Sequence, residues 1–225
     1  VQDGRNHLLT TSKTYDVITA EPPPPTQAGA VNLYTKEYYE LTKKALNPGG
    51  IVSQWIPLHS QTKTHIYEHF QTFLDSFPYV MGWYPVKQEL ILIGSNDPIN
   101  FDFMKIKKRL KHPAANEVMR KIRFENPFTL LGSIWFLKGE LENMASKHSL
   151  ITDNNPSLEF FHSSSDVISR EVKYQFLKNR VSFDTVFKKV KNVASTDKEI
   201  FKSFWDQRIN AEYAEDVFQL GVNHV

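Results

Sequence analysis

Three short stretches of the sequence carry polar side chains of the kinds that bind or activate small molecules. They are Asp3-Gly4, Glu21 directly before four prolines, and Gln54-Trp55. The Asp3 carboxylate can accept hydrogen bonds from an adenine amine or a ribose hydroxyl, and Gly4 lets a flat ring approach the backbone. Glu21 could accept a proton from an amine nucleophile or bind a cation. Gln54 offers both a donor and an acceptor, and Trp55 offers an aromatic wall.

Each of these residues also fits a structural role. Asp3-Gly4 is typical of a turn or a helix cap, and Glu21 of a solvated strand exit. Trp55 equally fits core packing. His65 and His69 are four residues apart but lack the acidic residue of the metalloprotease pattern, so we predict no metal site there.

The elements that must position these side chains alternate between strands and helices. "YDVITAE" is a short apolar run and predicts a central parallel strand buried on both faces. Pro22 to Pro25 must leave the sheet as an extended loop, because proline cannot donate to a ladder. Residues 33–46 predict a helix with Thr35 as its N-cap, ended by the Asn47-Pro48-Gly49-Gly50 turn.

The pattern then repeats and closes on a hairpin. "GIVSQWIPL" predicts a second strand, and "TKTHIYEHFQTFLDSF" a helix. "YVMGWYPV" and "ELILIGSN" predict an antiparallel pair. Such an order indicates an α/β fold with a partial Rossmann-like sheet that ends in an antiparallel hairpin. We place a boundary near residue 98: residues 1–97 form the α/β domain, and residues 98–225 a helical C-terminal extension.

Composition excludes several classes of protein. The chain has 225 residues, 40% of them hydrophobic and 23% charged, which is typical of globular proteins. It has no cysteine, so disulfides, thiolate metal sites and cysteine nucleophiles are excluded. A net charge of +2 does not indicate nucleic acid as a partner, and we interpret the basic run from Lys105 to Lys111 as the solvated face of a helix. No apolar run is long enough to span a bilayer.

The start of the sequence indicates how it relates to a longer protein. Val1 precedes an Asp-Gly pair that is typical of a strand end, so we expect this sequence to be a fragment whose missing strands lie upstream. We expect a cytoplasmic location, with attachment to a membrane region upstream as the alternative.

The segments resemble, in order, those of the spermidine synthase-like family. "VQDGRNHLL" resembles its V-x-D-G-x-x-F-L segment, and "YDVITAEPPPP" its Y-D-V-I-I-x-D-S-S-D-P segment. "NLYTKEYYELTKKALNPGGIVSQWIPL" resembles its L-Y-T-x-E-F-Y…L-x-P-G-G-I…Q segment, and "ELILIGS" also fits. The resemblance covers residues 1–96. "LITDNNPSLEFF" is similar to a T-D-D-x-P-x-L-E-F element in larger members, some of which carry membrane segments upstream.

The resemblance implies a class I S-adenosylmethionine-dependent methyltransferase fold and, in the full-length protein, an aminopropyltransferase. The co-substrate would be decarboxylated S-adenosylmethionine, or S-adenosylmethionine itself, with no metal. The partner would be a small-molecule amine rather than nucleic acid, and a homo-oligomer is left open. The implied site residues are Asp3 and Gly4 on the adenine, Glu21 as the catalytic base, and Tyr34, Gln54 and Trp55 in the acceptor pocket.

The sequence departs from the family at two positions of its acidic motif. Glu21 replaces the first Asp and is one methylene longer, while Pro24 replaces the second and cannot attract an ammonium group. Losing that contact should weaken polyamine binding by roughly 1 to 3 kcal/mol. The Gly-rich cofactor loop is absent from this chain. Two alternatives therefore stay open: an S-adenosylmethionine-dependent methyltransferase, and a non-catalytic interaction module derived from the fold.

Overall fold

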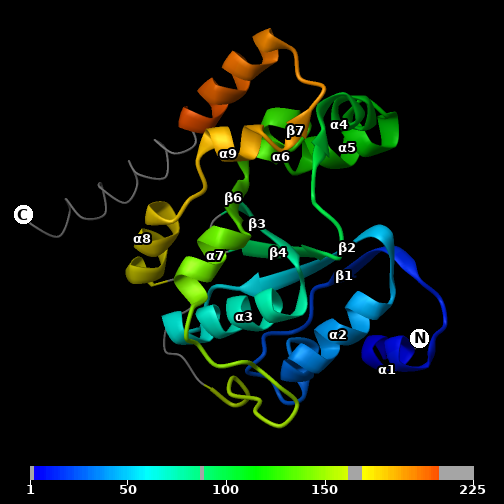
Figure 1. The fold of residues 1–225 in the computed structure, drawn as a ribbon, viewed down its shortest axis with the longest axis vertical. Helices are drawn as coiled ribbons and strands as arrows, with labels where there is room; N and C mark the ends of the chain where they lie inside the picture. The colour runs from blue at the N-terminus through cyan, green and yellow to red at the C-terminus, as the bar shows by residue number, and fades with distance from the viewer. Residues whose placement is uncertain (1–2, 87–88, 162–168, 208–225) are drawn as a thin grey trace, which may run out of the picture. The chain divides into compact units, whose positions relative to one another are not determined.

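The structure is a computed structural model that describes residues 3–86, 89–161 and 169–207 (Figure 1). The first part of the chain contains α1 (Gly4–Thr10), β1 (Tyr15–Ala20), the 3-10 helix η1 (Ala30–Leu33), α2 (Lys36–Lys44), β2 (Leu46–Pro57), α3 (Lys63–Ser76), β3 (Tyr79–Val86) and β4 (Glu89–Ser95). The rest contains β5 (Phe101–Asp102), α4 (Phe103–Leu110), α5 (Pro113–Lys121), α6 (Pro127–Gly132), β6 (Ile134–Leu137), α7 (Lys138–Ala145), α8 (Arg170–Lys178), α9 (Phe183–Phe187) and β7 (Val190–Lys191). Residues 195–207 are also helical.

The chain divides into two compact units. Unit 1 comprises Val1–Ile99 and Ile134–Val181, and unit 2 comprises Asn100–Ser133 and Ser182–Val225. The boundary predicted near residue 98 lies beside the first crossing between the units, at Ile99. The chain then returns to unit 1 at Ile134, so each unit is built from two separate stretches of sequence. The division into domains at 1–97 and 98–225 stays a prediction.

Unit 1 is built on a five-stranded mixed sheet with the order β1-β2-β4-β3-β6. β1 and β2 are parallel, with Ala20 opposite Gln54. β4 runs antiparallel between β2 and β3, with Leu92 opposite both Gln54 and Gly82. The predicted α/β class and its antiparallel hairpin are confirmed. The N-cap predicted for the helix is confirmed, because Thr35 caps α2 by accepting from the amide of Tyr38. The predicted end of that helix is wrong: α2 stops at Lys44, and Asn47 to Gly50, expected to form a turn, lie inside β2.

Two expectations about the sheet are wrong. β1 is not a central strand buried on both faces: among the described residues it pairs only with β2, and Val17 is 56% exposed. The short apolar run of "YDVITAE" looks the same in an edge strand and in a central one. The sequence analysis also missed β6, which lies in the region predicted to be helical and pairs antiparallel with β3. A four-residue strand between two helices carries too short a pattern to detect.

The core of unit 1 lies between one face of the sheet and the helices in front of it in Figure 1. Alternate residues of β2, including Val52 and Ile56, point to this face and are fully buried. Side chains from α2, α3, α7 and α8 complete the cluster, among them Tyr39, Phe73 and Phe176. The helices therefore pack on one face of the sheet, and their side chains share a core with β2.

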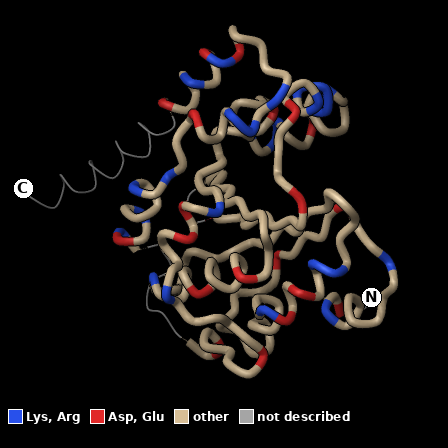
Figure 2. The backbone as a smooth tube through the Cα atoms, viewed as in Figure 1, with Lys and Arg blue, Asp and Glu red and all other residues tan. Residues whose placement is uncertain are grey.

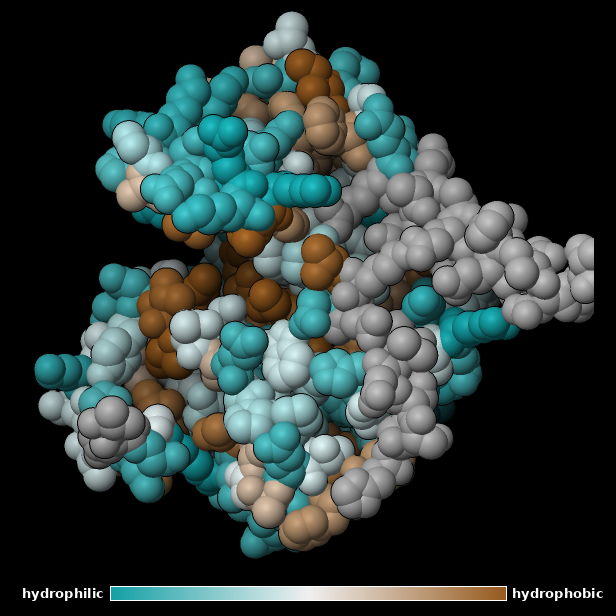
Figure 3. All heavy atoms as spheres, turned by 180° about the vertical axis from the view of Figure 1, so that it is seen from behind, coloured by the Kyte–Doolittle hydropathy of each residue, from teal (hydrophilic) through white to brown (hydrophobic). Residues whose placement is uncertain are grey.

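The other face of the sheet is apolar and only half-buried. Trp55 and Ile91 are opposite each other across β2 and β4, and both are partly exposed. In Figure 3, which views the molecule from behind, hydrophobic side chains are visible over the part of unit 1 that carries the sheet.

Unit 2 is mainly helical and is held by stacked aromatic rings. The ring of Phe128 stacks on Phe103 and Phe201 at centroid distances of 5.3 and 5.8 Å. Phe183 contacts Phe201 and Trp205 at 5.1 and 5.9 Å. The helical character predicted for residues 98–225 is present in α4, α5, α6 and α9, whereas residues 162–168 and 208–225 of that prediction lie outside the described residues. β5 and β7 add a two-stranded parallel sheet that the sequence analysis did not expect. Within residues 3–86, 89–161 and 169–207, no helix is long and apolar enough to cross a membrane.

Candidate functional site

The chain leaves the sheet at Glu21, directly after β1. Glu21 is exposed, whereas Pro22 and Pro25 behind it are buried. The hydroxyl of Tyr34 donates to the carbonyls of Pro22 and Pro23 at 3.3 and 3.2 Å. The Glu21 carboxylate therefore lies at the start of a loop whose backbone is restrained by its prolines and by hydrogen bonds from the buried Tyr34.

Tyr34 is an anchor of this loop rather than an open binding group. Its side chain is completely buried, and burial together with the nearby charge of Glu21 raises the pKa of Tyr34 well above its usual value. The hydroxyl consequently stays protonated and keeps donating to the loop. Its predicted role in the acceptor pocket stays a prediction, and the hydrogen bonds to the loop are the role that the geometry describes.

A buried polar row continues from Tyr34 into α3. The Tyr34 ring contacts the His69 ring at 5.0 Å, and His69 Nε2 lies 3.1 Å from Gln61 Oε1. His69 is fully buried, and burial, with a smaller effect from His65, lowers the pKa of His69 to about 3. The imidazole is therefore neutral at physiological pH. In the described part of the chain, no three His, Asp or Glu side chains are grouped so that they could hold a metal ion.

Asp3 and Gly4 lie at the start of α1. Asp3 caps the helix, since its Oδ1 accepts from the amide of Asn6 at 2.8 Å. Both residues are exposed, and a Cβ added to Gly4 would meet no atom within 4 Å. The helix-cap alternative is thus realised, while the space beside Gly4 is open to a flat ligand. The predicted contact with adenine stays a prediction.

Three buried tyrosines, Tyr34, Tyr38 and Tyr39, follow the proline loop in the sequence. Burial raises the pKa of Tyr38, and the charges of Arg5 and Asp3 act on this hydroxyl in opposite directions. The charge of Glu21 acts on Tyr34, and Tyr34 and Tyr38 both act on Tyr39. The charges of Asp3 and Glu21 thus act on different tyrosine hydroxyls.

Gln54 and Trp55 point to opposite faces of the sheet, as successive strand residues must. Gln54 is fully buried on the core face; its Nε2 donates to the Trp55 carbonyl at 3.2 Å, and its Oε1 has no hydrogen-bond partner among the described residues. Trp55 is half-buried, and its Nε1 donates to the carboxylate of Glu89. A direct role for both residues in one acceptor pocket stays a prediction, although the two side chains lie on opposite faces of the sheet.

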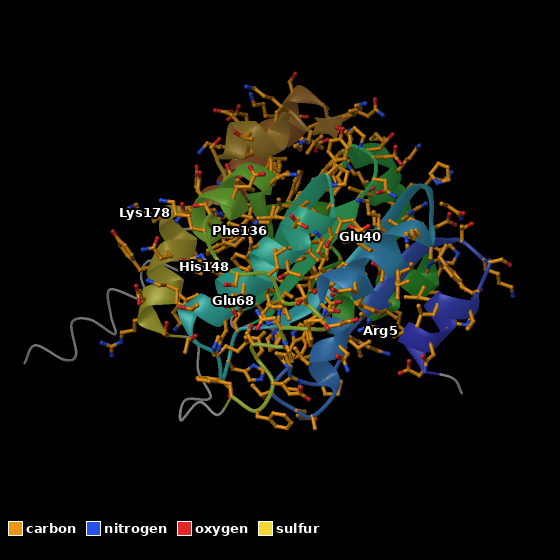
Figure 4. The ribbon with its side chains drawn as sticks, turned by 60° about the horizontal axis from the view of Figure 1, so that its bottom comes forward. Arg5, Glu40, Glu68, Phe136, His148 and Lys178 are labelled. Carbon is orange, nitrogen blue, oxygen red and sulfur yellow. The ribbon has the colours of Figure 1, made fainter. Side chains whose placement is uncertain are left out.

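Residues 151–161, which we call the strap, contact α1, α2 and the proline loop. The sequence analysis assigned no role to this segment. The guanidinium of Arg5 forms a bidentate ion pair with Asp153, and Thr35 donates to Asp153 Oδ1 at 2.8 Å. These bonds to Arg5 hold the pKa of Asp153 below its usual value. The amide of Lys36 donates to Ile151 O at 2.9 Å, which fastens the strap to the start of α2. Figure 4 labels Arg5 on α1.

The second half of the strap contacts the proline loop and α3. Glu159 Oε1 accepts from the amide of Gly29 at 2.8 Å, where φ is +77° and favours glycine. The amide of Phe160 donates to Thr26 O at 3.3 Å. Ser157 donates to Glu68 Oε2 at 2.9 Å, and Figure 4 shows Glu68 on α3. The strap thus restrains the loop that follows Glu21; its only signal in the sequence is the resemblance of "LITDNNPSLEFF" to the family element.

The Glu21 carboxylate directly follows a strand of the parallel pair, and α/β proteins bind ligands outside the carboxyl ends of such strands. Residues 1–86 match the family model described as the spermine/spermidine synthase domain. This part of the chain is therefore similar to that domain, and the resemblance found in the motifs is confirmed over these residues.

Two proteins illustrate the similarity. A polyamine aminopropyltransferase from Aeropyrum pernix is 35% identical over 68 residues, which are 29% of this chain and 22% of the relative. The chain thus aligns with less than a quarter of that relative's length. A crystal structure of a probable spermidine synthase from Corynebacterium glutamicum is 18% identical, with a TM-score of 0.45, and the match covers 68% of this chain and 53% of the solved chain.

Proposed function

We propose that the protein containing this chain transfers an aminopropyl group from decarboxylated S-adenosylmethionine to a small amine. The observation that carries this proposal is Glu21, an exposed carboxylate on a restrained loop inside the segment that matches the spermine/spermidine synthase domain. No other exposed carboxylate directly follows a strand of the parallel pair in the described residues.

The chemistry follows from the position of Glu21. The amine nitrogen attacks the propyl carbon bonded to the sulfonium, a carbon–nitrogen bond forms, and the carbon–sulfur bond breaks with its electron pair going to sulfur. Methylthioadenosine leaves, and the proton lost by the nitrogen passes to the Glu21 carboxylate. Asp3 and the open backbone at Gly4 would hold the adenine. Decarboxylated S-adenosylmethionine supplies the electrophilic carbon.

Pro24 sets the class of acceptor. The position that carries a second carboxylate in the family carries no charge here, so an acceptor with several ammonium groups loses one ionic contact. We therefore propose an amine with a single cationic group besides the attacking nitrogen, or none.

The experiment is an assay of methylthioadenosine release by the full-length protein with decarboxylated S-adenosylmethionine and a panel of mono-, di- and triamines. Glu21→Gln should lower turnover at least tenfold, because the general base is lost, while the affinity for methylthioadenosine measured by calorimetry stays nearly unchanged. Asp16→Asn is the matched control, since it removes an exposed carboxylate from the same strand and should leave turnover unchanged.

The outcomes separate the candidates. Equal turnover of Glu21→Gln and the parent protein would remove Glu21 from the mechanism. Release of S-adenosylhomocysteine from S-adenosylmethionine, without methylthioadenosine, would favour the methyltransferase, for which the uncharged Pro24 is the supporting observation. Failure to bind either nucleoside would favour the non-catalytic module.

A further inference from the structure

Helices α4 and α5 of unit 2 carry a surface that the proposed transferase does not use. Residues 104–123 include eight Lys or Arg and one acidic residue, Glu117, whose carboxylate is paired with Lys121 at 2.9 Å. In Figure 2 the Lys and Arg positions gather along the two helices that Figure 1 labels α4 and α5. This concentration contrasts with the formal charge of +2 of the whole chain.

Three of the four cations of α4 lie on the face away from its buried residues, while Lys107 lies over the Phe103 ring. Phe103 and Leu110, seven residues apart, are buried and define the inner face of the helix. Lys105, Lys108 and Arg109 are exposed, as is Lys111 at the end of the helix. The positive charge of α4 therefore faces solvent.

Aliphatic side chains are also exposed on α4 and at the end of α5. Met104 is 56% exposed and precedes Lys108 by one helical turn. Val118 on α5 and Ile122, the C-cap residue of that helix, are 57% and 54% exposed, and Lys121 directly precedes Ile122. We call these three apolar residues, together with Lys105, Lys108, Arg109 and Lys111, the basic-apolar surface. Folding within unit 2 leaves these apolar side chains in water.

The combination of charge and exposed aliphatic groups indicates what the surface binds. Interfacial membrane-binding helices combine Lys and Arg with apolar side chains that enter the boundary between headgroups and acyl chains. Proteins that bind single-stranded nucleic acid instead use aromatic side chains for base stacking. Residues 104–123 contain no Phe, Tyr or Trp, and the flanking Phe103 and Phe124 are buried. The chemistry therefore matches an anionic lipid surface better than a nucleic acid.

We propose that the basic-apolar surface binds anionic phospholipid membranes, with its cations at the headgroups and Met104, Val118 and Ile122 in the interface. This role is independent of the proposed transferase, since no residue of the Glu21 region takes part. Each cation near an anionic bilayer contributes about 1 kcal/mol of attraction, and the apolar side chains make part of the binding resistant to salt.

The test is flotation of the full 225-residue chain with vesicles of phosphatidylcholine alone and with added phosphatidylserine. The parent chain should float only with the anionic vesicles. Neutralising three cations in Lys108→Gln/Arg109→Gln/Lys111→Gln should lower the partition coefficient between about tenfold and a hundredfold. The matched control Lys13→Gln/Lys44→Gln/Lys178→Gln changes the net charge equally at exposed positions of unit 1 and should bind like the parent.

A second variant tests the apolar part of the surface. Met104→Gln/Ile122→Gln keeps every charge and should lose the binding that survives high salt, while circular dichroism confirms that it is folded. The proposal is overturned if the parent chain does not bind the anionic vesicles, or if the triple variant and its control bind equally. The proposal is also overturned if high salt abolishes vesicle binding of the parent and of the apolar variant equally. Tighter binding to single-stranded RNA than to the vesicles would overturn it as well.

Discussion

Single residues around the loop after Glu21 are buried in their uncharged forms. The hydroxyl of Tyr34 and the imidazole of His69 are both fully buried, and burial is the main cause of the shift in each pKa. Such groups restrain the loop through hydrogen bonds and ring contacts, and they leave Glu21 as the exposed ionisable group at this point. The surroundings of Glu21 are therefore rigid rather than highly charged.

The neutral state of His69 makes the stability of unit 1 depend on pH. The unfolded chain binds a proton near pH 6.5, but native His69 does so only near pH 3, so the unfolded state holds more protons between these values. The free energy of unfolding should fall as the pH decreases from 6.5 toward 4, by up to roughly 1 kcal/mol per pH unit. Urea unfolding of the parent and His69→Gln at several pH values measures this, and the variant should show a shallower slope.

His65→Gln is the comparison for this measurement. Burial also lowers the pKa of His65, but the side chain is only half-buried, so this variant should change the slope less than His69→Gln does. Equal slopes for the parent and His69→Gln would contradict the assignment.

At the scale of elements, close contact between the sheet and α3 determines how the central strands pack. Gly94 of β4 lies against the rings of Phe73 and Phe77, which contact each other at 4.8 Å. A Cβ at Gly94 would lie 2.6 Å from Phe77 Cγ and 2.9 Å from Phe73 Cε1. The same sheet carries Gln54 on the core face, so displacement of α3 would also disturb the candidate site.

Gly94→Ala should therefore destabilise unit 1 by about 1 to 3 kcal/mol, because two packed aromatic rings must move. Gly139→Ala in α7 is the control, since a Cβ there meets no atom within 4 Å and alanine favours a helix by about 0.5 kcal/mol. Urea unfolding followed by tryptophan fluorescence measures both. Equal stability of Gly94→Ala and the parent would show that Phe73 and Phe77 can move aside without lowering the free energy of unfolding.

At the scale of the whole molecule, unit 1 is assembled from stretches that lie far apart in the sequence. Trp135, Phe136 and Leu141 come from residues 134–181, yet they belong to the same core cluster as Phe73 and Leu92. The strap, residues 151–161, adds the ion pair between Asp153 and Arg5. The part that matches the spermine/spermidine synthase domain is therefore completed by residues outside the matched segment 1–86.

This dependence predicts how fragments behave. Residues 1–97 alone lack β6, α7, α8 and the strap, so we expect them to unfold without a cooperative transition. A chain that joins residues 1–99 to 134–181 through a flexible Gly/Ser linker should unfold cooperatively, because it holds all of unit 1. Urea titrations of both fragments provide the comparison. A cooperative transition of residues 1–97 with the midpoint of the longer fragment would support the boundary near residue 98.

Features that depend on near neighbours could be predicted from the sequence. The cap at Thr35, the apolar periodicity of α3 and the β3–β4 hairpin arise from interactions within a few residues. The ordered motifs of residues 1–96 also indicated the similarity to the spermine/spermidine synthase domain, which the family model matches over residues 1–86. Glu21 was expected at a strand end and lies directly after β1.

Features that depend on contacts between distant parts of the chain could not be predicted from the sequence. Arg5 and Asp153 are 148 residues apart, and nothing in either neighbourhood indicates that they pair. The same holds for β6 beside β3, for the edge position of β1 and for the strap over the proline loop. Local preferences involve a few adjacent side chains, whereas these pairings form only when the packed core brings distant segments together.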